Sequence, residues 1–214
     1  MYIEVLQPGR VDYDAAVRLQ EDLRRQVMAS GGAKAFLVLL EHPPVITVGR
    51  GGKAGHVLAD AEALRRQGVQ LRETSRGGDV TYHGPGQLVG YPILDLRRCA
   101  CGPDVHRYLR DLEQVIIDML AEFGIVGRRE AGLTGVWTGA GKVAAIGVAI
   151  RRWVTMHGFA VNANPEMGHF GLIVPCGLAD RAVTSMTALL GRPVGVEELV
   201  EPTIRAFARV FDTA

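Results

Sequence analysis

Cys176 is the residue whose surroundings first suggest covalent chemistry. It lies between Pro175 and Gly177. Proline fixes its own backbone φ, and glycine permits a sharp turn or a close approach to a ligand, so this setting can hold a sulfur at a chosen point. A free cysteine is also one of the most frequently buried residue types. Taken alone, the flanking residues therefore favour a structural role over a nucleophile.

A glycine-rich string from Arg76 to Gln87 offers a second kind of chemistry. It contains four glycines and one proline together with arginine, threonine, tyrosine and histidine side chains. We expect a loop whose backbone amides can approach a carbonyl or phosphate oxygen. It is neither a Walker loop, since no Gly-Lys-Ser/Thr follows, nor a dinucleotide fingerprint, since Gly77 and Gly78 do not open a helix.

Two strand-like strings complete the set of candidates. In the string Gly141–Val148, Lys142 starts a predicted strand of small and β-branched residues. Strict alternation places Ala145 and Gly147 on one face, where they leave room for a ligand chain. It places Lys142 on the other face, so a bend is needed to bring Lys142 to the same site. The second string, His157–Asn162, contains a histidine that fits the core and a site equally well.

The elements that must position these residues alternate between helix and strand. N-cap residues, apolar periodicity and glycine stops predict helices over residues 12–28, 60–67, 104–124 and 196–211. Short apolar runs predict strands over residues 36–40, 45–48 and 88–96, and consecutive strands over 136–162. Strand pairs joined by tight turns argue against a purely parallel sheet. We therefore predict an α/β fold with a mixed β-sheet flanked by helices.

Composition limits the class of protein. The chain has 214 residues, 48% of them hydrophobic, which suits one domain over residues 1–214. A net charge of +1 gives no reason to expect nucleic-acid binding. We expect no signal peptide and no membrane helix. An odd cysteine count of three fits a reducing, cytoplasmic setting. Cys99 and Cys101 lack metal-ligand spacing, so we expect no metal site.

Taken together, the strings closely resemble the lipoyl(octanoyl) transferases over nearly the whole chain. The matching motifs are Arg76–Gln87, Gly141–Gly147, His157–Asn162 and Val174–Gly177. The resemblance implies the biotin/lipoate protein ligase-like fold. It also implies transfer of an octanoyl group from octanoyl-acyl carrier protein to a lysine of an apo-lipoyl domain, the first step of endogenous protein lipoylation. The acceptors it implies are the lipoyl domains of 2-oxoacid dehydrogenase complexes and the glycine cleavage H protein.

The resemblance assigns roles to individual residues. Cys176 is the implied nucleophile, which forms a thioester acyl-enzyme, and Lys142 is the implied residue that promotes its ionisation. This pairing is chemically coherent because a nearby cation stabilises a thiolate. No cofactor is implied, since transfer from a thioester to an amine is downhill without ATP. The implied substrate-binding residues are Arg76, Gly77, Gly78, Asp79, Val80, Thr81, Tyr82, His83, Ala145, Ile146, Gly147, Gly158, Phe159 and Ala160.

Three other functions stay open at this stage. An ATP-dependent lipoate-protein ligase would share the fold and the glycine-rich string but needs no cysteine nucleophile. A non-enzymatic module that binds medium-chain acyl groups would form no covalent adduct. A cysteine hydrolase would release the free acid. Backbone amides at Gly77, Gly78 or Gly147 are equal candidates for stabilising an oxyanion, and His83 is a candidate for orienting the reacting groups.

Overall fold

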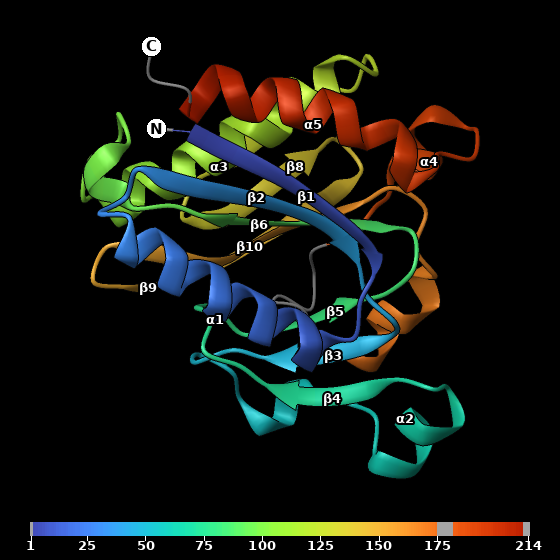
Figure 1. Cartoon of the computed structure of the whole chain (residues 1–214). Coiled ribbons are helices and arrows are strands. Elements are labelled where there is room, and N and C mark those ends of the chain that lie inside the picture. Colours follow the sequence, from blue (N-terminus) through green and yellow to red (C-terminus); the bar gives the residue numbers. More distant parts are fainter. Residues whose placement is uncertain (1, 175–181, 212–214) are drawn as a thin grey trace.

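The computed structural model describes residues 2–174 and 182–211 of the chain. Within them, two β-sheets and their covering helices account for most of the backbone (Figure 1). The strands are β1 (Tyr2–Arg10), β2 (Lys34–Glu41), β3 (Val45–Val48), β4 (Gln70–Glu73), β5 (Val80–His83), β6 (Gln87–Ile93), β7 (Arg128–Glu130), β8 (Leu133–Thr138), β9 (Gly141–Arg151) and β10 (Val154–Asn162). The helices are α1 (Tyr13–Ala29), α2 (Ala61–Arg66), α3 (Val105–Ala121), α4 (Met186–Leu190) and α5 (Val196–Phe211), with 3₁₀ turns η1 (Ala54–His56), η2 (Leu96–Arg98) and η3 (Met167–Leu172).

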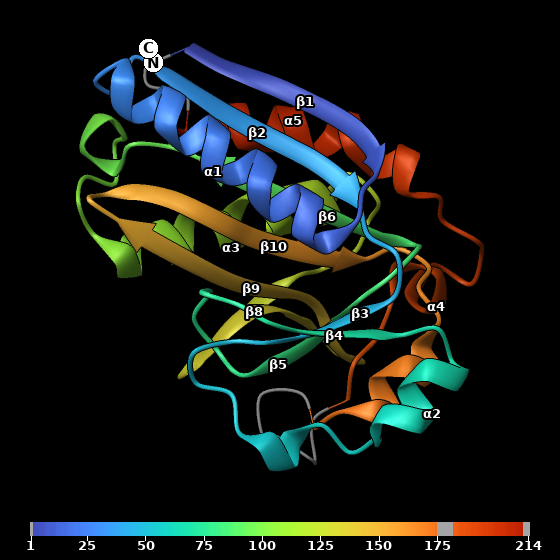
Figure 2. The same cartoon turned by 60° about the horizontal axis from the view of Figure 1, so that its bottom comes forward.

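The large sheet has seven strands in the order β1-β2-β6-β10-β9-β8-β7. Only β1 and β2 pair in parallel, and the other neighbours are antiparallel. The small sheet has the order β4-β3-β5, with one parallel and one antiparallel pair. The predicted mixed sheet flanked by helices is confirmed, and the small sheet lies below the large one (Figure 2).

Helix α1 covers one face of the large sheet, and α3 and α5 cover the other (Figure 1). Asp12 caps α1, and its side chain accepts hydrogen bonds from the amides of Asp14 and Ala15. Helix α1 buries Tyr13, Ala16, Leu23 and Val27, the stripe that its sequence predicts, together with Gln20. The helix therefore forms where capping and apolar periodicity place it.

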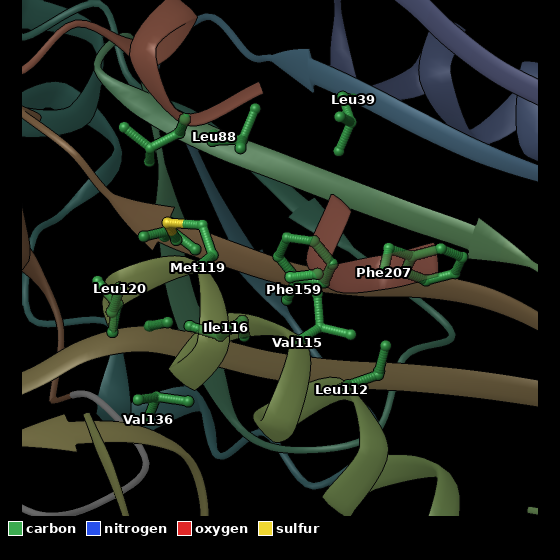
Figure 3. Close-up of a cluster of buried hydrophobic side chains, with 14 of the residues drawn as sticks. Leu39, Leu88, Leu112, Val115, Ile116, Met119, Leu120, Val136, Phe159 and Phe207 are labelled. Carbon is green, nitrogen blue, oxygen red and sulfur yellow. The ribbon is translucent and has the colours of Figure 1, made fainter. Parts of the chain in front are cut away.

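Helix α3 supplies most of the core on the opposite face. Leu112, Ile116 and Met119 are buried against Phe159 of β10 and Phe207 of α5 (Figure 3). Asp104 caps this helix as predicted. The helical spacing of Val105, Leu109, Leu112, Ile116, Met119 and Phe123 predicts one apolar stripe, but the Val105 side chain is 37% exposed. It begins the helix and extends beyond the edge of the core, so periodicity alone misplaces it.

Two other local predictions need correction. The central part of the expected loop, from Val80 to His83, is strand β5, which pairs with β3. These β-branched and aromatic residues follow the glycines and suit a pleated surface better than a loop. Strand β6 ends at Ile93 rather than Leu96, because Asp95 caps η2 and turns the chain.

Replacing Leu112 with alanine should lower the free energy of unfolding by about 2–5 kcal/mol, because Leu112 is fully buried and the change leaves a cavity. Urea unfolding followed by far-ultraviolet circular dichroism measures the loss. Leu58→Ala is the control, since the Leu58 side chain is 61% exposed and should cost far less. Equal losses in the two variants would contradict this account of the core.

Candidate active site

A pocket lies between β5 of the small sheet and β6, β9 and β10 of the large sheet. Small residues of β9 and β10, among them Ala145, Gly147, Gly158 and Ala160, form one wall. Its remaining lining residues are Tyr13, Arg76, Gly78, Asp79, Val80, Thr81, Tyr82, His83, Gln87, Tyr91, Lys142, Ala144, Ile146, His157, Phe159, Asn162, Phe170 and Val183. These small side chains leave space along β9 and β10 within the pocket.

Lys142 marks one end of this pocket. Its side chain is buried, and Nζ lies 5.4 Å from the centroid of the Trp137 ring, which is within cation–π range. Gly135 has a φ of +121°, and a Cβ at this position would lie only 2.6 Å from Cε of Lys142. The Gly135 amide donates to the buried carboxylate of Glu113 at 3.1 Å. The glycine and its partner on α3 therefore leave space for the lysine side chain.

The backbone of Lys142 is held by the chain on the far side of the undescribed segment. The Lys142 amide donates to the Ala182 carbonyl at 2.9 Å, and the Thr184 amide donates to the Lys142 carbonyl at 2.9 Å. The β8–β9 register also shifts between Val136 and Trp137. Lys142 lines the same pocket as Ala145 and Gly147. Strict alternation predicted that Lys142 lies on the opposite face of the strand from Ala145 and Gly147, but all three residues line one pocket.

Arg76 ties the glycine-rich string to the small sheet. Its guanidinium is buried and donates from Nε to Oγ1 of Thr47 at 3.1 Å and from Nη2 to the Thr47 carbonyl at 2.6 Å. Nη1 donates to the Gly77 carbonyl at 3.0 Å. These three bonds fix the start of the string against β3 while the side chain still lines the pocket.

Gly77 and Gly78 then cross the edge of β9. The Gly77 amide donates to the Val148 carbonyl at 2.8 Å. A Cβ on Gly147 would lie 3.0 Å from the Gly77 carbonyl oxygen, so a side chain there would push the two segments apart. Gly78 has a φ of +83°, which glycine adopts at little cost. The pocket wall therefore depends on backbone packed directly on backbone.

Asp79 connects the string to the chain that precedes Cys176. Its carboxylate pairs with Nδ1 of His56 and accepts from the Lys53 amide at 3.3 Å. The His56 carbonyl accepts from the Val174 amide at 2.8 Å. Cys176 itself lies outside the described residues. The last described residue before it and the first one after the segment, Val174 and Ala182, are both anchored beside the pocket.

The other end of the pocket is built from aromatic and histidine rings. His83 stacks on Tyr13 with the ring centroids 6.4 Å apart, and Tyr91 meets His157 edge to face at 6.1 Å. The Tyr91 hydroxyl lies 2.7 Å from Nε2 of His42. Among the described residues, the buried Nδ1 of His83 has no hydrogen-bond partner. Neutral rings at this end are therefore the favoured state.

Burial keeps these histidines uncharged. It lowers the pKa of His157 to about 4, with Arg76 adding repulsion. It holds the pKa of His83 well below the ordinary value, and it also lowers that of His42. His157 has a φ of +57°, held by its amide, which donates to Oε1 of Gln20 at 2.7 Å. Such backbone strain in a non-glycine residue is common where a site over-determines the conformation.

The structure brings together nearly all of the residues expected at the site. Of the implied binding residues, only Gly77 is not part of the pocket lining; its amide is already bonded to β9. Tyr13, Tyr91 and Phe170 line the pocket but carried no sequence signal beyond ordinary apolar positions. His157, left open between core and site, lines it too. In residues 2–174 and 182–211, no three or more histidine, cysteine or acidic side chains gather as metal ligands.

Comparison with known proteins supports this description. The lipoyl protein ligase A/B catalytic domain model matches residues 12–208, and the chain belongs to that family. Within this family, the chain is similar to proteins named octanoyltransferase over almost its whole length. One from Geobacter metallireducens is 49% identical over 95% of this chain and 91% of that protein. One from Solibacter usitatus is 52% identical over 96% and 91%.

A solved structure shows the same fold. The lipoate protein ligase of a bipartite system from Thermoplasma acidophilum superposes with a TM-score of 0.73. It covers 98% of this chain and 84% of that one at 16% sequence identity. The predicted lipoate ligase-like architecture is therefore confirmed. In the described part of the chain, no helix has the length and apolar character needed to cross a membrane.

Acidification from pH 7 to pH 5 should destabilise the protein partly through His157. Its pKa is about 4 in the folded chain and about 6.5 in the unfolded chain, so the unfolded state binds more protons between those values. Stability is therefore full above pH 6.5 and falls as the pH drops through this window. His157→Asn should lose about 2 kcal/mol less than the wild type between pH 7 and pH 5.

Urea unfolding at the two pH values measures this difference. Asparagine suits the replacement because it tolerates a positive φ. His106→Asn is the matched control for the substitution itself, since His106 is exposed on α3. The assignment fails if His157→Asn and the wild type lose the same stability on acidification.

Proposed function

We propose that this chain transfers an octanoyl group from octanoyl-acyl carrier protein to a lysine of apo-lipoyl domains, through a thioester on Cys176. The observation that carries the proposal is the pocket that Lys142 lines together with small residues of β9 and β10. Relatives about 50% identical over almost their full length are named octanoyltransferase, which supports the acyl group and the reaction type.

In the first step, Lys142 Nζ accepts the proton of the Cys176 thiol. The thiolate then attacks the carbonyl carbon of the donor thioester, with the acyl chain in the pocket. The bond between that carbon and the donor sulfur breaks, and the donor thiolate takes the proton from Lys142. The products are the octanoyl-enzyme and the free thiol of the carrier.

In the second step, the neutral amine of the acceptor lysine attacks the acyl-enzyme carbonyl. An amide bond forms, and the bond to the Cys176 sulfur breaks. Lys142 takes the proton from the nitrogen and returns it to the departing thiolate, which restores the starting enzyme. Neither step consumes ATP, because an amide is more stable than the thioester that it replaces.

The charge that develops on the carbonyl oxygen needs a hydrogen-bond donor. Of the three glycine amides considered from the sequence, that of Gly77 already donates to Val148. Gly147 faces Gly158 inside the β9–β10 ladder. Gly78 has a left-handed backbone, lines the pocket and has no backbone hydrogen bond from its amide in the described part of the chain. We therefore assign the oxyanion contact to the Gly78 amide.

The proposed acceptors are the lipoyl domains of 2-oxoacid dehydrogenase complexes and the glycine cleavage H protein, in the cytoplasm. An ATP-dependent lipoate ligase is the second candidate, because a lipoate protein ligase shares the fold. That likeness, at 16% identity, concerns architecture alone, whereas the octanoyltransferases share about half of the sequence. Transfer from a carrier thioester is therefore the better-supported reaction.

Intact-mass analysis after incubation with octanoyl-acyl carrier protein should show one octanoyl adduct on the wild-type chain. Adding an apo-lipoyl domain should move that mass to the domain. Cys176→Ser should form no thioester, and Lys142→Ala should acylate at least about 100-fold more slowly with its fold intact, since general acid–base groups contribute about 10²–10⁴-fold. Circular dichroism checks the fold.

Cys101→Ser is the matched control, because Cys101 lies on the η2–α3 connection and is not part of the pocket lining. It should acylate like the wild type. A Lys142→Ala variant that acylates at the wild-type rate would exclude the proton role. If the chain catalyses ATP-pyrophosphate exchange with free lipoate and the Cys176→Ser variant retains this activity, the chain is an ATP-dependent lipoate ligase and the proposed transfer reaction is wrong.

A further inference from the structure

A second, open groove begins where the pocket ends. Pocket and groove share five lining residues: Gly78, Asp79, Lys142, Ile146 and Gly147. Because Lys142 lines both, the two spaces meet at the proposed reacting centre. The groove has a volume of about 710 Å³. A thioester at Lys142 with its acyl chain in the pocket therefore has the groove in front of its sulfur.

The walls of the groove include both apolar and polar side chains. Val105 and Leu109 of α3 form one side, and Leu133 and Thr134 at the start of β8 continue it. Val105 is the residue that the helical pattern misplaced in the core; its exposure brings it into this groove. An apolar ligand that covers the Val105 side chain removes apolar surface from water, which favours binding.

One edge of β9 is open along the groove. Strand β8 pairs with β9 only over Gly141–Ala144, so from Ile146 onward β9 pairs with β10 on one side and with no described strand on the other. The Val148 carbonyl points outward at this edge, since it accepts from Gly77. The amide and carbonyl of Ile146, two residues earlier, point the same way. An open strand edge offers hydrogen bonds to the amides of an extended ligand.

Lys53 contributes a positive charge to the lining of the groove. The Lys53 side chain is exposed and has no ion pair among the described residues, while its amide is fixed by Asp79. Asp79 is itself paired with His56. The rim therefore presents one positive charge on a well-anchored loop, which favours an anionic group at the outer end of a bound ligand.

We infer that this groove binds the phosphopantetheine arm of the acyl donor. The inference rests on the proposed function, because it takes the donor to be a carrier-bound thioester. The arm is a flexible chain with two amides, a geminal dimethyl group and a terminal phosphate. The open edge of β9 faces its amides, Val105 and Leu109 contact its apolar part, and Lys53 meets its phosphate.

Three donors of increasing length test this assignment. S-octanoyl-N-acetylcysteamine lacks the outer amide, the dimethyl group and the phosphate; S-octanoyl-phosphopantetheine contains the whole arm; the octanoylated carrier protein adds the protein surface. Val105→Trp fills the groove, and Lys53→Glu reverses the rim charge. Each variant should lower kcat/KM for the phosphopantetheine donor by about tenfold, chiefly through KM, and leave the short donor within about twofold.

Two matched substitutions serve as controls. Val126→Trp places the same bulk on an 84% exposed valine outside the groove, and Lys34→Glu reverses an exposed charge on β2. Both should retain wild-type kinetics with all three donors. An equal loss for the short and long donors in Val105→Trp would overturn the assignment, because the groove would then act only through the pocket or the fold.

The order of the two half-reactions separates the remaining outcomes. If Val105→Trp acylates normally from every donor but slows transfer to the lipoyl domain, the groove serves the acceptor and the inference is wrong. If the wild type forms no acyl-enzyme from any of the three donors, the proposed function fails instead. Selective loss with the full arm supports both.

Discussion

The contact of the Gly77–Gly78 segment with the open edge of β9 is the constraint on which the other features of the site depend. The 2.8 Å bond from the Gly77 amide to the Val148 carbonyl and the close approach at Gly147 hold the glycine-rich string directly against β9. Arg76, buried and bonded to Thr47, fixes the same segment from the other side. Residues of this contact, Gly78 and Gly147, line both the pocket and the groove.

The histidine rings that line the pocket are uncharged, and the buried Arg76 guanidinium near them helps to keep the pKa values of His83 and His157 low. Lys142 lies over the Trp137 ring at the end where the groove begins. At the other end, burial keeps the rings of His42, His83 and His157 uncharged.

Much of the fold could be predicted from local patterns. Asp12 and Asp104 cap their helices, and the apolar stripe of α1 is buried as its spacing indicates, because capping and periodicity depend on neighbours in the sequence. Val105 and β5 were misassigned. At a helix terminus the periodic pattern does not say whether a neighbouring element covers the side chain. In a glycine-rich string, the pairing of Val80–His83 with β3 depends on a partner more than thirty residues away.

The sequence by itself determined the types of residue at the site, because their motifs identify the family and its glycines mark close backbone approaches. It could not show that Lys142 and Gly147 line one pocket, since a register shift between β8 and β9 overrides simple alternation. Tyr13 and Tyr91 reach the same pocket from α1 and β6, and nothing local distinguishes them from core residues. Only the tertiary structure decided these positions, because they depend on how two sheets pack around one glycine-rich edge.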